Sequence, residues 1–296
     1  MTYLLLALVI IMWSTVGILV KIAGTMVDSN MITFCRFFFG ILFLGILLLI
    51  RDGRIRITWR SRWIWFAAIG KMLNYVFENL ALSMGSAYTN IVVMPIQAIF
   101  LASVATFFLK EKMNFKKGLA LLLCIVGVTL VGGKGASLEA FLSDGILPLI
   151  LFTLSAIGAG LFVLGQKVLA DKMDAADMNF SVFLISSLFT ALPLTFTKNM
   201  IGSWSMGAML ALIALGLITG ISFYINSIIL QRLPLLVAGI FGNTSVLFTL
   251  IWVKLFFNER INNNVIIGAF IFVMGIIILN LPHSNKNKNK KSIGSI

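Results

Sequence analysis

The sequence predicts an all-α membrane protein with ten transmembrane helices, built as two inverted five-helix repeats. Hydrophobic residues make up 60% of the 296 residues, the mean hydropathy is +1.05, and only 11% of the residues are charged. A soluble domain of this length needs far more charge to cover its surface. The apolar residues also fall in blocks of about 18–25, the length that carries a helix across about 30 Å of hydrocarbon. Strands of a membrane barrel alternate apolar and polar residues in segments of about ten instead.

The ten predicted spans are divided equally between the halves of the chain. The first five cover residues 3–23, 31–50, 63–82, 88–109 and 118–133, and the second five cover 146–169, 178–197, 206–230, 235–257 and 265–281. Met1, Thr2 and Tyr3 lack the basic start of a secretory signal peptide, so the first span is expected to remain as a helix. The segment 283–296 is rich in Asn, Lys and Ser and is expected to be a disordered cytoplasmic tail.

The basic residues predict the orientation of these spans. With the N-terminus inside, 16 lysines and arginines fall in cytoplasmic loops and the tail and five fall outside, while Arg36 and Lys71 lie within spans. This bias predicts that both termini are cytoplasmic in a multi-pass protein of the plasma membrane, or bacterial inner membrane. The net charge of +13 is therefore assigned to orientation and to contact with membrane lipid, and nucleic acid is not an expected partner.

An internal repeat with a register of 148 residues relates the two halves. Glu111 follows the fourth span and Glu259 follows the ninth, and a glycine stands sixteen residues after each, at Gly127 and Gly275. Because each copy holds an odd number of helices, the second copy must be inserted upside down. The predicted units are residues 1–135 and 136–282. Inverted repeats of this kind place binding sites near the membrane midplane, where the copies meet.

The chain resembles the EamA-type members of the drug/metabolite transporter superfamily over roughly residues 3–282. The resemblance rests on the five-plus-five helices, on the turn that ends in Glu after the fourth and ninth spans, and on Trp13-Ser14-Thr15 in the first span. The family commonly has Gly before that Glu, whereas this chain has Lys110 and Asn258. The resemblance implies a secondary transporter that exports amino acids or other metabolites and is coupled to an ion gradient or to exchange.

The third span carries the most informative polar pattern. Positions i, i+3, i+4, i+7 and i+8, which form one face of a helix, hold Lys71, Asn74, Tyr75, Glu78 and Asn79. A central Lys or Glu that faces lipid costs roughly 2.5 kcal/mol or more, so this face is expected to line other helices or a water-filled cavity. At the same register the eighth span has an uncharged face of Thr219, Ser222, Phe223, Asn226 and Ser227.

Two cations and one carboxylate lie well inside the predicted spans, away from the turns at their ends. Glu78 and Arg36 lie about 6 Å and about 7.5 Å from the outer ends of their helices, so their depths match. Either they form a structural salt bridge, or Glu78 binds a substrate amine or a coupling proton. Lys71 lies near the midplane, where it either snorkels or pairs with backbone carbonyls, or else meets an anionic group of the substrate. Together, Lys71 and Glu78 would grip a zwitterion such as an amino acid.

Further candidates surround this polar face. Pro95 in the fourth span is a hinge candidate, with a purely structural kink as the alternative. Trp13 and Tyr75 are placed to stack on a planar or cationic ligand. The predicted substrate-binding set is completed by Arg36, Gln97, Ser222, Asn226 and Asn243.

The sequence offers no cofactor or metal site. No His/Cys/Asp cluster is present, and residues 127–134 lack the spacing of a phosphate-binding loop, which argues against an ATP-driven pump. An intramembrane enzyme would need a nucleophile with a base or metal. The leading prediction is export of amino acids or similar metabolites by alternating access, with a small-molecule substrate and a proton or another coupling ion as partners. The alternatives are a broad-specificity proton-coupled drug or cation exporter, and a non-transporting sensor or scaffold.

Overall fold

The computed structural model describes residues 2–84, 93–107, 110, 113–132, 146–196, 201–233, 244–257 and 263–280. All regular elements in these ranges are helices, and the one β pairing among them is an isolated bridge between Val27 and Ile201. The predicted tail 283–296 and most of the connection between the predicted units lie outside these ranges.

The helices of the first half correspond to the first five predicted spans. They are α1 (Thr2–Ser14), α2 (Val16–Ala23), α3 (Ser29–Asp52), α4 (Arg62–Met84), α5 (Val93–Phe107) and α6 (Phe115–Gly132). The side chain of Asp28 starts α3 by accepting a hydrogen bond from the N–H of Met31 at 2.8 Å. Gly53, at a φ of +65°, ends α3 in the left-handed conformation that glycine adopts without strain.

The helices of the second half follow the same order. They are α8 (Ile146–Leu169), α9 (Ala175–Ala191) with the 3₁₀ turn η2 (Leu192–Thr195), α10 (Met206–Leu217), the π turn η3 (Ile218–Ser222), α11 (Phe223–Arg232), α13 (Ser245–Phe257) and α14 (Asn263–Asn280). Asp174 starts α9 as Asp28 starts α3, accepting from the N–H of Ala176 at 2.8 Å. The seventh span was predicted to continue as a helix to residue 197, but α9 changes to a 3₁₀ turn that contains Pro193.

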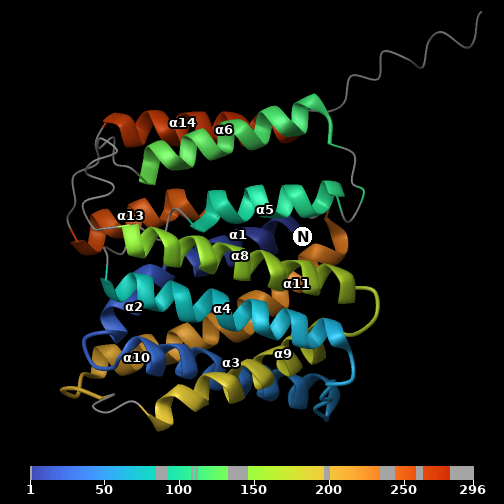
Figure 1. Cartoon of the computed structure of the whole chain (residues 1–296), viewed down its shortest axis with the longest axis vertical. Coiled ribbons are helices and arrows are strands. Elements are labelled where there is room, and N and C mark those ends of the chain that lie inside the picture. The colour runs from blue at the N-terminus through green and yellow to red at the C-terminus, as the bar shows by residue number, and fades with distance from the viewer. Residues whose placement is uncertain are drawn as a thin grey trace, which may run out of the picture.

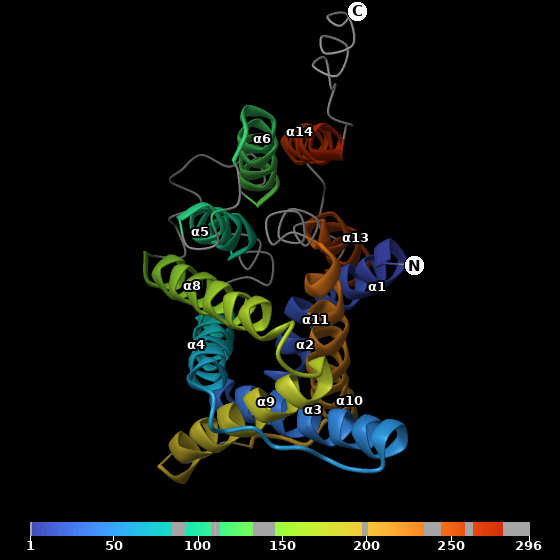
Figure 2. The ribbon, with the colours of Figure 1, turned by 90° about the vertical axis from the view of Figure 1, so that its right-hand side faces the viewer.

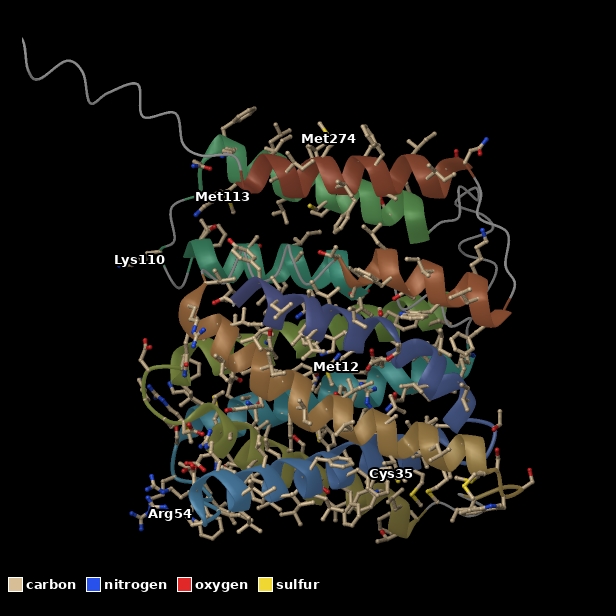
Figure 3. All side chains as sticks on the ribbon, turned by 180° about the vertical axis from the view of Figure 1, so that it is seen from behind. Met12, Cys35, Arg54, Lys110, Met113 and Met274 are labelled. Carbon is tan, nitrogen blue, oxygen red and sulfur yellow. The ribbon has the colours of Figure 1, made fainter. Side chains whose placement is uncertain are left out.

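Within the described residues, five helical segments are long and apolar enough to cross a membrane, which indicates a multi-pass membrane protein. They are Thr2–Ala23, Ser29–Asp52, Ile150–Leu169, Ala175–Thr195 and Met206–Arg232. Arg54 and Lys110, both predicted to be cytoplasmic, lie toward the same end of the bundle (Figure 3).

Two of the predicted spans are interrupted in the structure. The first breaks between α1 and α2, where the hydroxyls of Ser14 and Thr15 donate to the carbonyls of Ile11 and Met12 at 2.7 and 2.8 Å. Such back-bonding by Ser and Thr bends helices. The eighth span is divided by η3, and π turns within helices are frequent at functional sites. The two interruptions meet, because the indole N–H of Trp13 donates to the Ser222 hydroxyl at 2.8 Å.

The helices lie side by side along one common direction (Figure 1), and their packing repeats between the halves. Helix α4 packs on α8, and α10 packs on α2; likewise α3 packs on α10, and α9 packs on α4. Helices α6 and α14 pack on each other at the edge of the bundle that is farthest from α3 and α10 (Figure 2).

The contact between α6 and α14 joins matching positions of the two halves. The thiol of Cys124 lies 3.9 Å from the carbonyl oxygen of Phe272, which stands 148 residues later. A Cβ on Gly127 would meet Phe272, and a Cβ on Gly275, again 148 residues later, would meet Cys124. Each contact is thus repeated with the halves exchanged, which is the arrangement that a two-fold axis produces.

Candidate functional site

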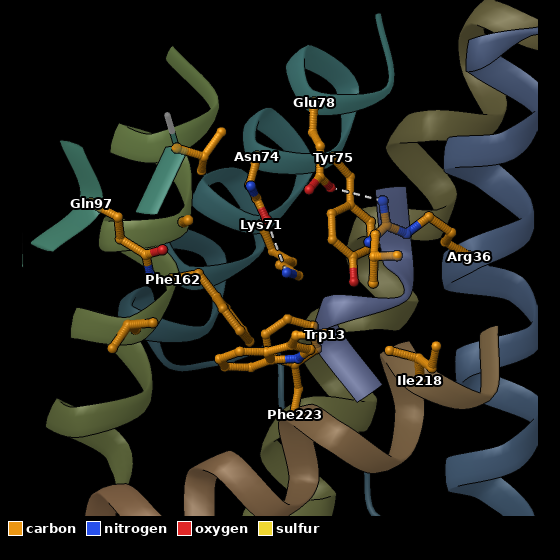
Figure 4. A pocket seen from close by; sticks show the side chains of 14 residues that line it. Trp13, Arg36, Lys71, Asn74, Tyr75, Glu78, Gln97, Phe162, Ile218 and Phe223 are labelled. Carbon is orange, nitrogen blue, oxygen red and sulfur yellow. Dashed lines mark hydrogen bonds and ion pairs between the residues drawn. The ribbon is translucent and has the colours of Figure 1, made fainter. Parts of the chain in front are cut away.

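A pocket lies in the middle of the bundle, between α1, α3, α4, α5, α8 and the η3–α11 segment (Figure 4). It encloses about 70 Å³ of free volume. Seven of the residues predicted to bind substrate line it, namely Trp13, Arg36, Lys71, Asn74, Tyr75, Glu78 and Gln97.

The polar face of α4 is buried, as its helical spacing predicted. Lys71, Tyr75 and Asn79 are each 1% exposed, although two of them carry a strongly polar group. Neighbouring helices therefore cover this face, and each polar atom on it needs a partner inside the protein.

Arg36 from α3 and Glu78 from α4 form an ion pair. Nη1 of Arg36 lies 2.8 Å from Oε2 of Glu78 and donates a second bond, of 3.1 Å, to the Asn79 side-chain oxygen. The Asn79 amide donates in turn to the hydroxyl of Thr33 at 2.7 Å. The guanidinium also lies 3.4 Å from the centre of the Tyr75 ring. Arg36 and Glu78, which the sequence placed at similar depths in the membrane, therefore form an ion pair in the structure.

Lys71 has different surroundings, because its ammonium group is held by an amide and by aromatic faces. It donates to the side-chain oxygen of Asn74 at 2.9 Å. Its nitrogen lies 3.6 Å from the centre of the Phe223 ring, 3.9 Å from that of Tyr75 and 5.0 Å from that of Phe162. Of the ion pairs within the described ranges, none includes Lys71.

Asn74 is oriented toward Lys71 by a second helix. Its amide nitrogen donates to the Ser155 hydroxyl on α8 at 2.9 Å, and that hydroxyl donates to the Asn74 carbonyl at 3.0 Å. Because the nitrogen is engaged in this way, the side-chain oxygen is the atom that faces the ammonium.

Four residues around Lys71 form a second set of matching contacts. Tyr75 and Phe223 stand 148 residues apart, as do Lys71 and Thr219. The Tyr75 hydroxyl lies 2.9 Å from that of Thr219, and in the matching contact the Lys71 nitrogen lies over the Phe223 ring. The axis that relates the halves therefore passes through the pocket, and the charge lies on one side of it.

The remaining predicted residues lie elsewhere. Ser222 accepts the bond from Trp13, and Asn226 donates to the side chain of Gln166 at 3.2 Å, outside the pocket lining. Pro95 is the third residue of α5, and Asn243 lies outside the described residues. Whether these residues bind substrate stays a prediction.

A second cavity, of about 340 Å³, lies near the start of α3 and is partly lined by Lys21, Asp28, Ser29, Asn79 and Ser83. Asn79 links it to the central pocket, because its side-chain oxygen accepts a hydrogen bond from Arg36, which lines that pocket. An access route from this end would therefore pass the Arg36–Glu78–Asn79 cluster.

Polar contacts also link the helices toward the opposite end of the bundle. The Gln166 amide donates to the side-chain oxygen of Asn179 at 3.1 Å and to the Ser227 hydroxyl at 2.7 Å. Nearer the end, Arg51 bonds Asp174 at 2.9 Å. Partial burial raises the pKa of the Asp174 carboxyl, but the hydrogen bonds from Arg51 and from backbone N–H groups outweigh it, so the pKa lies below its usual value.

A family model for EamA-like transporters matches the chain twice, over residues 1–133 and 146–281. The chain belongs to the EamA-like transporter family. The two matches correspond to the two repeats, and the family is one of transporters.

One solved structure shows how the EamA-like fold is shared. It is titled only as the crystal structure of a protein, is 16% identical, and superposes with a TM-score of 0.79 over 95% of this chain and 97% of its own. At this identity the likeness concerns the fold alone. No curated protein matches the sequence.

Two aromatic residues of this EamA-like pocket, Phe162 and Phe223, were not in the predicted substrate-binding set. Phe162 lies in an apolar helix without any distinguishing pattern, so nothing in the sequence separates it from packing residues. Phe223 had a usable signal, because it stands 148 residues after Tyr75.

Proposed function

We propose that this EamA-like protein is a secondary active transporter that exports a small carboxylate-bearing metabolite, such as an amino acid, across the plasma membrane. The central pocket is the substrate site, and the two halves alternate its access between the sides of the membrane. The proposal includes ten spans in two inverted units, residues 1–135 and 136–282, with both termini in the cytoplasm. The matched contacts at α6–α14 and around Lys71 support the two-fold relation.

The observation that carries the proposal is the environment of Lys71. A buried ammonium is costly unless it is paired, and here one amide oxygen and three ring faces compensate it only in part. A carboxylate from a ligand in the pocket would supply the missing partner. The pocket thus offers a charged anchor that the fold itself does not satisfy.

Glu78 is proposed to couple transport to a proton. It is the carboxylate that holds Arg36, so protonation would weaken the cluster between the pocket and the second cavity. A substrate amine that reached Glu78 would have the same effect, since it would compete with Arg36. In both cases the ligand or proton would act on the barrier to this end of the bundle. Pro95 remains the proposed hinge.

Flux of labelled amino acids into and out of vesicles that contain the purified protein tests this proposal. Lys71→Ala is expected to abolish flux, Glu78→Gln to remove its dependence on the proton gradient, and Lys172→Ala, at an exposed lysine, to leave it unchanged. Unchanged flux in both pocket variants, in well-folded protein, would refute the assignment of the site. A protein that moves no carboxylate but does move organic cations would be the drug or cation exporter, and one that moves neither under any gradient would be the sensor or scaffold.

A further inference from the structure

Three aromatic rings and one amide oxygen form a box around the end of the Lys71 side chain. The rings are those of Tyr75, Phe162 and Phe223, whose centres lie 3.6 to 5.0 Å from the ammonium nitrogen (Figure 4). Trp13 supports the box from outside, with its ring centre 5.3 Å from that of Phe223. Rings within about 6 Å of a cation are the arrangement by which proteins recognise organic ammonium groups.

The Phe162 and Phe223 rings come from elements other than the one that carries the cation. Phe162 belongs to α8 and Phe223 to α11, whereas Lys71 and Tyr75 belong to α4. The halves of the protein thus build the box together, and a residue of the first half fills it. The matching residue of the second half, Thr219, is too short to do so and bonds the Tyr75 hydroxyl instead.

We infer that Lys71 is a built-in occupant of a latent organic-cation site, and that this occupancy makes the pocket accept carboxylates and reject organic cations. The inference rests on the proposed function for the role of the pocket. A ligand ammonium would have to displace a tethered one, whose effective concentration is on the order of millimolar or higher. If it entered beside Lys71 instead, two like charges would lie a few ångströms apart in a medium that screens them poorly. A carboxylate does not need to displace the Lys71 ammonium, and its negative charge is attracted to Lys71 and not repelled.

The size of the latent site follows from the side chain that occupies it. Lys71→Ala removes Cγ, Cδ, Cε and Nζ, and these four atoms have the size and charge of propylammonium. The vacated space keeps the three rings and the Asn74 oxygen, which is bonded to the ammonium in the native protein. Propylammonium is therefore the probe that matches the vacancy, and it carries no carboxylate.

The experiment measures the thermal stability of the purified full-length protein against increasing propylammonium chloride or sodium butanoate. Propylammonium is expected to raise the melting temperature of Lys71→Ala in a saturable way and to leave the native protein unchanged. The native protein should show no response at propylammonium concentrations up to about 30-fold above those that half-saturate the variant, the factor of one desolvated cation–π contact. Lys71→Met is the matched control, because its side chain fills the same space without charge and should not respond. Butanoate should stabilise only the native protein.

Two results would overturn the inference. One is a monodisperse, folded Lys71→Ala variant that propylammonium does not stabilise more than Lys71→Met. The other is stabilisation of the native protein by propylammonium, a measurement that needs no variant to fold. Failure of the proposed function looks different. Vesicles with native protein that move no carboxylate would refute transport, while propylammonium binding to Lys71→Ala would still support the latent site.

Discussion

Replacing Glu78 with methionine leaves the Arg36 guanidinium inside the bundle without its carboxylate. The two side chains are 10% and 3% exposed, and their atoms lie 2.8 Å apart, so water can compensate little of the loss. Arg36 would keep its 3.1 Å bond to Asn79 and its position over the Tyr75 ring. Its Nε is buried without a hydrogen-bond partner among the described residues already in the native protein.

The magnitude follows from the burial of the pair. Removing one partner of a buried ion pair costs about 3–5 kcal/mol, whereas replacing both by apolar residues of similar volume is often neutral. Glu78→Met and Arg36→Met are each expected to lower the free energy of unfolding by about 3–5 kcal/mol, since each leaves the other charge buried. The double variant should lie within about 1 kcal/mol of the native protein, because no uncompensated charge remains.

The assay is equilibrium unfolding of the four proteins in mixed detergent micelles, analysed as a double-mutant cycle. Arg51→Met serves as the control, because its bond to Asp174 lies at the surface and should contribute at most about 1 kcal/mol. If the double variant loses the sum of the two single losses, the pair is not coupled and the reasoning fails. A stable double variant without flux would show that the pair acts in transport and not in folding.

Two further predictions concern packing and pH. A Cβ on Gly158 would lie 2.6 Å from the backbone nitrogen of Asn74 and 2.7 Å from the Gly70 carbonyl, so Gly158→Ala should cost about 1–3 kcal/mol by separating α4 from α8. Gly118→Ala, with nothing within 4 Å of the added Cβ, should be neutral or raise stability by up to about 1 kcal/mol in the same unfolding assay. Because the pKa of Asp174 is lowered in the folded protein, the stability it contributes is present above its ordinary pKa and is lost as pH falls through the lowered value. The melting temperature of the native protein should therefore fall more steeply with acid than that of Asp174→Asn, and parallel curves would contradict this.

Hydropathy and helical spacing predicted much of this fold because both are local. The polar face of α4 was visible since a charged residue inside an apolar block needs an interior partner, and Glu78 and Arg36 could be matched by depth alone. The interruptions at Thr15 and at η3 were not predicted, and their meeting at the bond between Trp13 and Ser222 could not be, because these two residues come from distant parts of the chain. Phe162 was missed for the same reason: an aromatic ring in an apolar helix shows its role only when its neighbours are in place.

The register of the internal repeat could be predicted from the sequence, but the contacts between the two copies could not. The register of 148 residues came from a few turn and glycine positions; it relates Tyr75 to Phe223 and Cys124 to Phe272, and the residues of each pair lie together in the structure. It could not show which pairs would meet, since that depends on how the two units dock. The predictions for Asn243, Glu111 and Glu259 fall outside the described residues.

The self-matching contact between α6 and α14 bears on the energetics of alternation. If two identical halves exchanged shapes, the starting and final states would have the same energy, and neither side of the membrane would be favoured. When the halves exchange shapes, a contact between two matching positions, such as Cys124 with Phe272, still joins the same two residues. Such a contact would contribute equally to the energies of both states, so it would favour neither. The resting preference of the protein would then be set by contacts that do not map onto themselves and whose matched residues differ. Lys71, matched by Thr219, is such a mismatch, so the residue proposed to anchor the ligand would also help to set which side the empty transporter faces.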